Sequence, residues 1–214
     1  MTKLTPFQKG HEDFRKVQFK QNKKRFKKLV DEGQNPKALF IGCSDSRVVP
    51  NLITGTGAGD LFITRNIGNL VPPFQSDSDF HATAAVIEYA VSHLQVSDII
   101  VCGHSDCGAV KALYEEHTVT EENIHTIKWL ELASDAKAAA LEALPHAPEH
   151  QLRSYTEKIS VVFQLENLLT YPAVRRGVEE GRIFLHGWHY DIEQGTIDYY
   201  DDETTTFRPL GETQ

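Results

Sequence analysis

Apolar runs rich in Val, Ile, Leu and Phe alternate along the chain with longer stretches whose apolar residues recur at helical spacing. The short runs predict four strands, at residues 37–42 (KALFIG), 60–64 (DLFIT), 98–102 (DIIVC) and 182–185 (RIFL). Because helical stretches recur between these strands, the pattern indicates an α/β architecture. The predicted fold class is therefore α/β.

Five helices are predicted after the second strand, over residues 80–94, 109–117, 121–144, 151–170 and 172–181. Ser78 or Asp79 is expected to cap the first of them. Residues 196–200 alternate between the two faces of a strand and follow a turn, which predicts an added edge strand. The chain contains no linker long enough to divide it, so we expect a single domain over residues 1–214.

The N-terminal segment, residues 1–33, is predicted to form a helical arm. Between residues 15 and 28 eight side chains are basic and none is acidic, although the whole chain has a net charge of −8. A basic run can bind nucleic acid, but Phe14, Val17 and Phe26 fall near helical spacing, which favours an amphipathic helix. Since the rest of the chain is acidic, we expect the arm to pack on a neighbouring subunit of a homodimer or larger homo-oligomer, and not on nucleic acid.

Length and composition limit the class of protein. The 214 residues suffice for one full hydrophobic core. No apolar run approaches the roughly 20 residues that a membrane helix needs, and residues 1–10 lack the charged-then-apolar pattern of a signal peptide. Three cysteines, an odd number, argue against a disulfide framework. A reduced, cytoplasmic protein without a transmembrane segment is expected.

Two of the predicted strands end in residues capable of metal and acid–base chemistry. The first is followed by Cys43, Asp45 and Arg47 (GCSDSR), and the third by His104 and Cys107 (GHSDCG). In open parallel sheets, ligands bind at the carboxyl ends of the strands. If these two strands are neighbours, two thiolates and one imidazole converge there, a set of ligands that favours Zn²⁺.

Three protein ligands leave a fourth tetrahedral position for water, as in a catalytic zinc site. Asp45 can take that position itself or accept a hydrogen bond from the bound water. Because a guanidinium can hold a carboxylate bidentately, we expect Arg47 to keep Asp45 off the metal. The alternatives are a structural zinc with four ligands and an ordinary surface ion pair. Cys102, inside an apolar run, is expected to be a buried thiol.

The stretches CSDSRVVP, GDLFITRNIGNLVPP, GHSDCGAV and NLLTYPAVRRGVEEGRIFLHGWHYDIEQGTIDYY together resemble a β-class carbonic anhydrase over most of the chain. The resemblance implies a Zn²⁺ ion held by Cys43, His104 and Cys107, with Asp45 and Arg47 as a catalytic dyad. It implies reversible hydration of carbon dioxide to bicarbonate and a proton by zinc-bound hydroxide. It further implies that Asp45 ligates the zinc in a closed, inactive state. For the fold, the resemblance implies a central four-stranded parallel sheet with an added edge strand, flanked by helices, and an N-terminal helix swapped between the subunits of a dimer.

The same resemblance implies a substrate pocket lined by Gln34, Phe62 and Tyr89. The two aromatic residues would offer an apolar wall suited to a small, uncharged substrate. Relatives regulated by bicarbonate carry a tryptophan three residues before the first zinc ligand, where this chain has Phe40. The chain is therefore similar to the plant-like, unregulated subgroup.

The sequence leaves two other functions open. Some relatives resemble the family at the zinc site but hydrolyse COS or CS₂, and a non-catalytic component of a CO₂-fixing compartment could dock through the basic arm. Ala58 and Ala109 depart from the family pattern beside the site. His186 and His189 could pair on a metal but are expected to be structural, and Ser105 is expected to be a turn residue, not a nucleophile.

Overall fold

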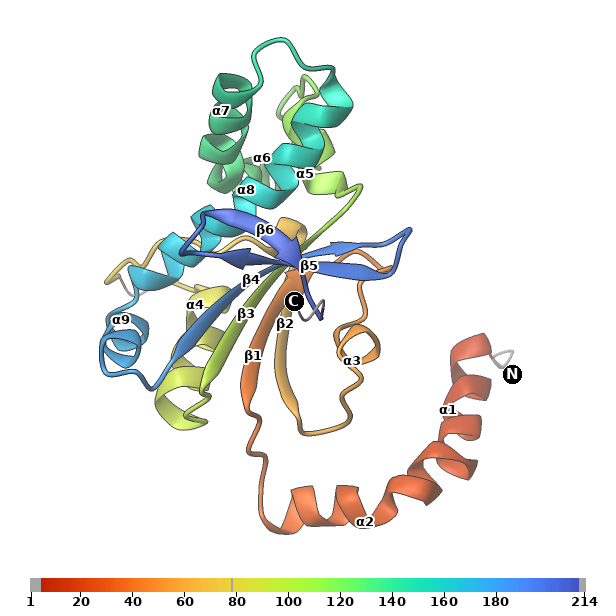
Figure 1. Cartoon of the computed structure of the whole chain (residues 1–214). Helices are drawn as coiled ribbons and strands as arrows, with labels where there is room; N and C mark the ends of the chain where they lie inside the picture. The colour runs from red at the N-terminus through yellow and green to blue at the C-terminus, as the bar shows by residue number, and fades with distance from the viewer. Residues whose placement is uncertain (1–4, 78, 212–214) are drawn as a thin grey trace. The chain divides into compact units, whose positions relative to one another are not determined.

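The computed structural model of the chain describes residues 5–77 and 79–211 (Figure 1). The chain divides into two compact units, residues 1–35 and residues 36–214. The boundary falls close to residue 33, where the predicted arm ends. Each unit is therefore described separately.

The N-terminal unit contains two helices, α1 (Pro6–Lys16) and α2 (Gln18–Asp31), so its predicted helical character is confirmed. Every residue of both helices is exposed or half-exposed. The rings of Phe14, Phe19 and Phe26 contact one another, with centroids 5.4 to 6.3 Å apart. Such a cluster makes an apolar stripe on an otherwise charged pair of helices. Its packing on a neighbouring subunit stays a prediction.

The second unit is built on a six-stranded sheet in the order β2-β1-β3-β4-β5-β6 (Figure 1). The strands are β1 (Ala38–Cys43), β2 (Leu61–Asn66), β3 (Asp98–His104), β4 (Phe184–Asp191), β5 (Thr196–Asp201) and β6 (Thr206–Pro209). The first four pair in parallel, whereas β5 and β6 are antiparallel. The α/β prediction is confirmed, with one strand more than expected. β6 lies outside β5, and its four residues are too few to show a clear alternation.

β1 lies between β2 and β3, and all six of its residues are buried. Because successive side chains point to opposite faces, Leu39 and Ile41 enter one core cluster while Ala38 and Phe40 enter another. A parallel strand covered on both faces reads as a continuous apolar run. This burial explains why the strand could be predicted from the sequence.

Three helices contribute to the core on one face of the sheet: α4 (Ala82–Glu88), α8 (Glu149–Leu169) and α9 (Pro172–Glu179). A short helix that was not predicted, α3 (Pro50–Ile53), contacts the opposite core cluster through Ile53. α8 and α9 begin and end within two residues of their predicted ranges. No helix in the described parts of the chain combines the length and hydropathy that crossing a bilayer requires.

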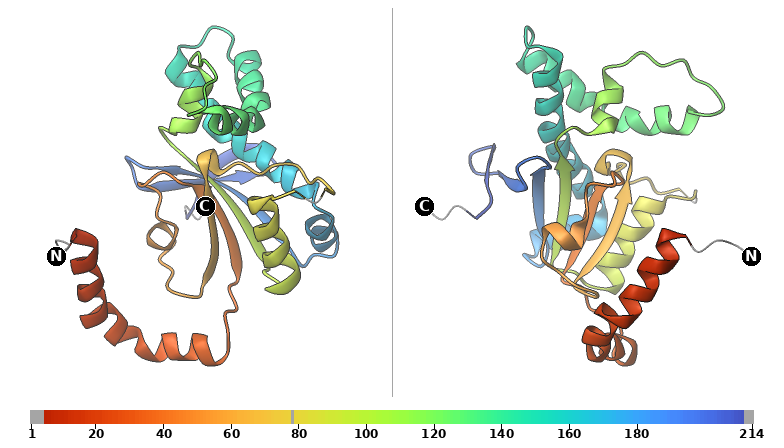
Figure 2. Two further views of the ribbon diagram at one scale, coloured as in Figure 1. Left: turned by 180° about the vertical axis from the view of Figure 1, so that it is seen from behind. Right: turned by 90° about the vertical axis from the view of Figure 1, so that its right-hand side faces the viewer.

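The region between α5 (Gly108–Leu113) and α8 differs from the single helix expected over residues 121–144. Residues 114–123 form a loop (green in the right panel of Figure 2), followed by α6 (Ile124–Leu130), the 3₁₀ turn η3 (Glu131–Ala133) and α7 (Ser134–Ala143). In the loop, the Asn123 side-chain oxygen accepts a hydrogen bond from the backbone N–H of Thr120 at 2.7 Å. Local bonds of this kind compete with the helix, so favourable helix propensity alone did not predict the break.

The helix that follows the second strand also begins later than expected. Its first residue is Ala82 and its N-cap is His81, so Asp79 is not the cap; Ser78 lies outside the described residues. The helix ends in one π-helical turn, η2 (Tyr89–His93). A single π turn inside an α-helix is often found at functional sites.

The hydroxyl group of Tyr171 is expected to contribute to the stability of the folded chain. Its hydroxyl donates to the Pro72 carbonyl at 2.9 Å, and burial raises its pKa to about 12. We expect Tyr171→Phe to lower the free energy of unfolding at pH 8 by about 1 kcal/mol, because the hydrogen bond is lost. The raised pKa means that this contribution is fully present below the ordinary tyrosine pKa and is lost as pH rises towards 12.

Urea unfolding of both proteins between pH 8 and pH 11 checks this expectation, and the difference between them should shrink as the pH rises. Equal stability of wild type and Tyr171→Phe at pH 8 would show that the hydroxyl contributes nothing.

Candidate metal centre and active site

The carboxyl ends of β1 and β3 meet because the two strands pair in parallel, with Gly42 beside Cys102. β1 ends at Cys43 and β3 at His104, and the following turn leads to Cys107 at the N-cap of α5. The two sulfur atoms and a ring nitrogen of the histidine all lie within 4.8 Å of one another, and all three residues are buried. The structure therefore brings together the three predicted ligands.

The imidazole of His104 is oriented as a metal ligand. Its Nδ1 lies 2.8 Å from the carbonyl oxygen of Ser105, and since a carbonyl can only accept, Nδ1 carries the proton. Nε2 is then an acceptor, and it is buried with no hydrogen-bond partner among residues 5–77 and 79–211. Ligand atoms bound tetrahedrally to one zinc lie roughly 3.5 to 3.8 Å apart. The residues present therefore fit a metal ion, which would satisfy this lone pair.

The two thiols perturb each other because they share one buried site. Hydrogen bonding from the Cys107 thiol lowers the pKa of Cys43 to about 4, helped by the neighbouring His104 ring and by the backbone N–H groups of Asp45 and Gly68. The same contact, together with burial, raises the pKa of Cys107 above its ordinary value. A divalent cation held by both sulfurs would lower the pKa of each, because the thiolate is the form of cysteine that binds a metal.

Asp45 lies beside this metal group and is held by Arg47. Nε and Nη2 of the guanidinium donate to the two carboxylate oxygens at 2.9 and 2.8 Å, and the backbone N–H of Arg47 adds a bond of 2.9 Å. These bonds hold the pKa of Asp45 well below its usual range. The carboxylate therefore stays ionised over the whole physiological range. Ligation of the metal by Asp45 in a closed state stays a prediction.

Arg65, in β2, is a site residue that the sequence did not single out. Its Nε donates to the Cys43 carbonyl at 2.8 Å, and its Nη2 donates to the Asp45 carbonyl. The loop after β1 is thus fixed from the neighbouring strand. The one signal available was a positive charge inside the run LFITRN, whose other members are apolar or neutral.

Three other candidates have structural contacts instead. Cys102 is fully buried, and burial raises its pKa to about 12, as expected for an inert thiol. His186 pairs with Asp98 at 2.8 Å, and the Ser105 hydroxyl oxygen accepts the backbone N–H of Ile192 at 2.9 Å. None of the three belongs to the metal group found among the described residues.

Two of the residues expected to line the substrate pocket, Phe62 and Tyr89, are not at the metal group of their own chain. Phe62 and Tyr89 stack on each other, with ring centroids 5.8 Å apart. Phe62 pairs with Leu39, near the start of β1, whereas Cys43 ends that strand, and four residues of strand span about 13 Å. Gln34 belongs to the N-terminal unit. That these three residues line a pocket stays a prediction.

Comparison with known proteins decides the family. A family model described as "Carbonic anhydrase" matches residues 38–197. The solved structure of the β-carbonic anhydrase CcaA has a TM-score of 0.88 and 38% identity, over 94% of this chain and 96% of the other. The chain belongs to the β-class carbonic anhydrase family. It is therefore an enzyme of the class that interconverts carbon dioxide and bicarbonate, and the resemblance seen in its motifs is confirmed.

Curated relatives agree with this assignment. A carbonic anhydrase of Pseudomonas aeruginosa is 45% identical over 187 residues, which cover 87% of this chain and 83% of the relative. One from Helicobacter pylori strain J99 is 38% identical over 208 residues, covering 95% and 93%. These relatives span nearly the full length of the chain, so the family extends beyond the metal motifs.

Two positions bear on variation within the β-carbonic anhydrases. Phe40 is fully buried and meets Trp188 edge-on, with ring centroids 6.4 Å apart; membership of the plant-like subgroup stays a prediction. Ala109 lies opposite Gly68, where an added Cβ would come within 3.0 Å of the alanine methyl group. A small residue at each position therefore suits the close approach of α5 and the 3₁₀ helix η1 (Ile67–Asn69) beside Cys43.

The buried thiols provide a matched test of the metal centre. We expect Cys43→Ser to lose most of its metal after zinc loading and dialysis against a weak chelator, because one of three protein ligands is weakened. Cys102→Ser removes an equally buried thiol and should keep about one zinc per chain, as wild type does. Elemental analysis by mass spectrometry measures this. If both variants lose the metal equally, the metal group is wrongly assigned.

Proposed function

We propose that the chain catalyses the zinc-dependent, reversible hydration of carbon dioxide to bicarbonate and a proton. The observation that carries this proposal is the buried, unpartnered Nε2 of His104 beside two thiols, with an ionised carboxylate next to them. Zn²⁺ bound there would act as a Lewis acid that lowers the pKa of water towards neutrality. Since two thiolates offset the charge of the ion, the effect should be weaker than in a site with three histidines.

Asp45 and Arg47 supply the acceptor that orients the attacking water. Oδ1 accepts both the guanidinium Nε–H and the backbone N–H of Arg47, whereas Oδ2 accepts only from Nη2. Oδ2 therefore keeps a lone pair that can accept a hydrogen bond from water. The low pKa of Asp45 means that it does not keep the proton released by the reaction. Asp45 is therefore assigned a role in aiming the water, and the proton leaves by another group or directly to solvent.

The substrate pocket is proposed to be completed by a second copy of the chain. Phe62 and Tyr89 stack near the amino end of the sheet, away from the metal group of their own chain. β2 ends the sheet on one side, and its region presents Ile63 and Ile67 at 37% and 44% exposure. An apolar sheet edge of this kind favours strand pairing with another copy. Two β-carbonic anhydrases of Sordaria macrospora are described as tetrameric.

The N-terminal arm is proposed to strengthen the same homo-oligomer, because its aromatic stripe is not buried within the arm itself. The described cysteines are free thiols, which suits the reducing cytoplasm or a CO₂-fixing compartment inside it.

The dyad is tested by Asp45→Asn. We expect kcat/KM for CO₂ hydration to fall about 100-fold, because the amide cannot accept from both guanidinium donors and still orient water. Asp98→Asn is the matched control, since this half-buried carboxylate is paired with His186 away from the metal group. Stopped-flow rates for wild type should rise with pH above neutrality. A flat profile, or faster turnover of COS than of CO₂, would contradict the proposed reaction.

The arm is tested in the full-length chain by Phe14→Ser combined with Phe26→Ser. We expect a lower oligomeric mass by analytical ultracentrifugation, because the apolar stripe is interrupted. Lys20→Gln combined with Lys24→Gln is the control, which alters charge on the same helix and leaves the stripe intact. Should the lysine variant dissociate while the phenylalanine variant stays assembled, charge and not apolar contact would hold the arm.

A further inference from the structure

Glu157, on the inner face of α8, is a buried acid outside the motifs that define the metal centre. It is only 7% exposed. One carboxylate oxygen accepts the backbone N–H of Cys107 at 3.0 Å, and the other lies 3.5 Å from Nε2 of His189. An acid so deeply buried is costly unless its oxygens have partners. The bond to a metal-ligand residue suggests why an acid is present there.

Both polar atoms of the peptide group between Asp106 and Cys107 are hydrogen-bonded to side chains. Its carbonyl oxygen accepts a bond of 3.0 Å from the Arg47 guanidinium, and its N–H donates to Glu157. Asp106 has a φ of +54°, a left-handed conformation that non-glycine residues adopt only at a cost. This turn determines where the Cys107 side chain points. Fixing both polar atoms of its peptide prevents the plane from rotating.

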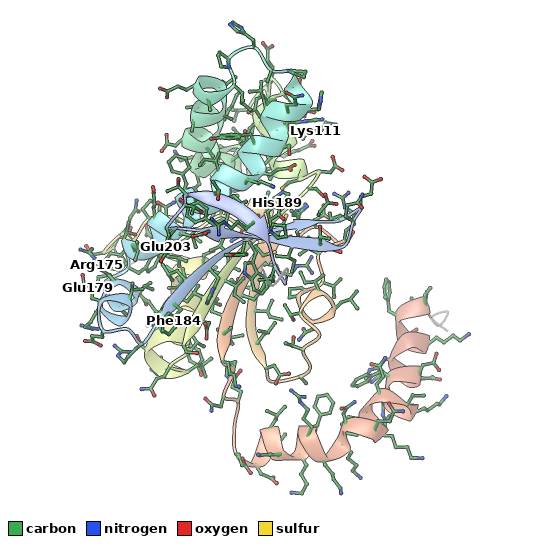
Figure 3. All side chains as sticks on the ribbon, in the orientation of Figure 1. Lys111, Arg175, Glu179, Phe184, His189 and Glu203 are labelled. Carbon is green, nitrogen blue, oxygen red and sulfur yellow. The ribbon has the colours of Figure 1, made fainter. Side chains whose placement is uncertain are left out.

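The placement of Glu157 depends on a close approach of α8 to the sheet. An added Cβ at Gly103 would come within 2.8 Å of the Val161 side chain and 3.3 Å of the Glu157 carbonyl, and one at Gly187 within 2.9 Å of Val161. Glycine at both positions therefore lets the helix lie close to β3 and β4. His189 pairs in register with Gly103, and Figure 3 shows it on β4, near the end of that strand. The buried side chains of Glu157 and His189 are thus positioned by a helix and a strand, α8 and β4.

We propose that Glu157 is a positioning residue that, supported by His189, locks the Asp106–Cys107 peptide so that the Cys107 sulfur stays directed at the metal. The role depends on the acceptor oxygen, not on the charge of the side chain. It rests on the proposed zinc function, since only a bound ion makes the direction of this sulfur important. Residues of this kind, beyond the ligands themselves, commonly alter metal affinity 10- to 100-fold.

The test compares Glu157→Met, which keeps length but has no acceptor, with Glu157→Gln, which retains one. Zinc affinity and release rate are measured with a chromogenic chelator, and the sulfur-to-cobalt charge-transfer band of the Co²⁺ form reports thiolate geometry. We expect Glu157→Met to bind zinc about 10- to 100-fold more weakly and to shift the cobalt band. Glu157→Gln should stay closer to wild type than to Glu157→Met in both measurements.

Gln164→Met is the matched control for loss of stability. Gln164 is fully buried on the same helix, and its oxygen accepts the backbone N–H of Val71 at 2.7 Å. This variant should lower the melting temperature and leave zinc affinity and the cobalt band unchanged. Unchanged zinc release in Glu157→Met, or loss in Glu157→Gln equal to that in Glu157→Met, overturns the proposal. If Glu157→Met does not fold, weakened zinc binding by Glu157→Gln would by itself overturn the proposal. Failure of wild type to bind zinc would instead refute the proposed function.

Discussion

The convergence of two cysteine sulfurs at the ends of adjacent parallel strands is the constraint on which the active site depends. The two sulfurs perturb each other at this separation: a hydrogen bond from the Cys107 thiol lowers the pKa of Cys43, and the same contact together with burial raises the pKa of Cys107. The sheet brings the sulfurs together regardless, because Cys43 ends β1 and Cys107 follows β3. Folding thus brings together three side chains that could hold one positive ion.

Residues from three separate segments hold that site in place. Arg47 binds the Asp45 carboxylate and the Asp106 carbonyl at once, so it joins the loop after β1 to the loop after β3. Arg65 fixes the first loop from β2, and Glu157 supports the second from α8. The ligands would be poorly placed without these bonds, since each lies at a strand end or in a turn.

The strands, the grouping of Cys43 with His104 and Cys107, and the Asp45–Arg47 pair could be predicted because each depends on short sequence motifs. An apolar run followed by Cys43 needs only its neighbours in the sequence to be recognised as a strand end with a ligand. Glu157 could not be found in this way, because it lies fifty residues from its partner Cys107. Its position on the stripe shared with Val161 and Leu168 was a usable signal, since an acid on an inner face needs a partner. β6 was not predicted because its four residues are too few to show the alternation of apolar and polar side chains that indicates a strand.

The hydrogen bond from His104 Nδ1 to the Ser105 carbonyl has a consequence for how the ion is acquired. This bond lies within the chain itself, so the ring has its working orientation before any ion arrives. In zinc fingers the ligand-bearing loops become ordered only on metal uptake, and chelators unfold them. In this protein, by contrast, a metal ion should bind to a site that is already formed. Stripping the ion should leave a folded apoprotein that is ready to be reloaded with zinc or with another ion of similar size and coordination preference.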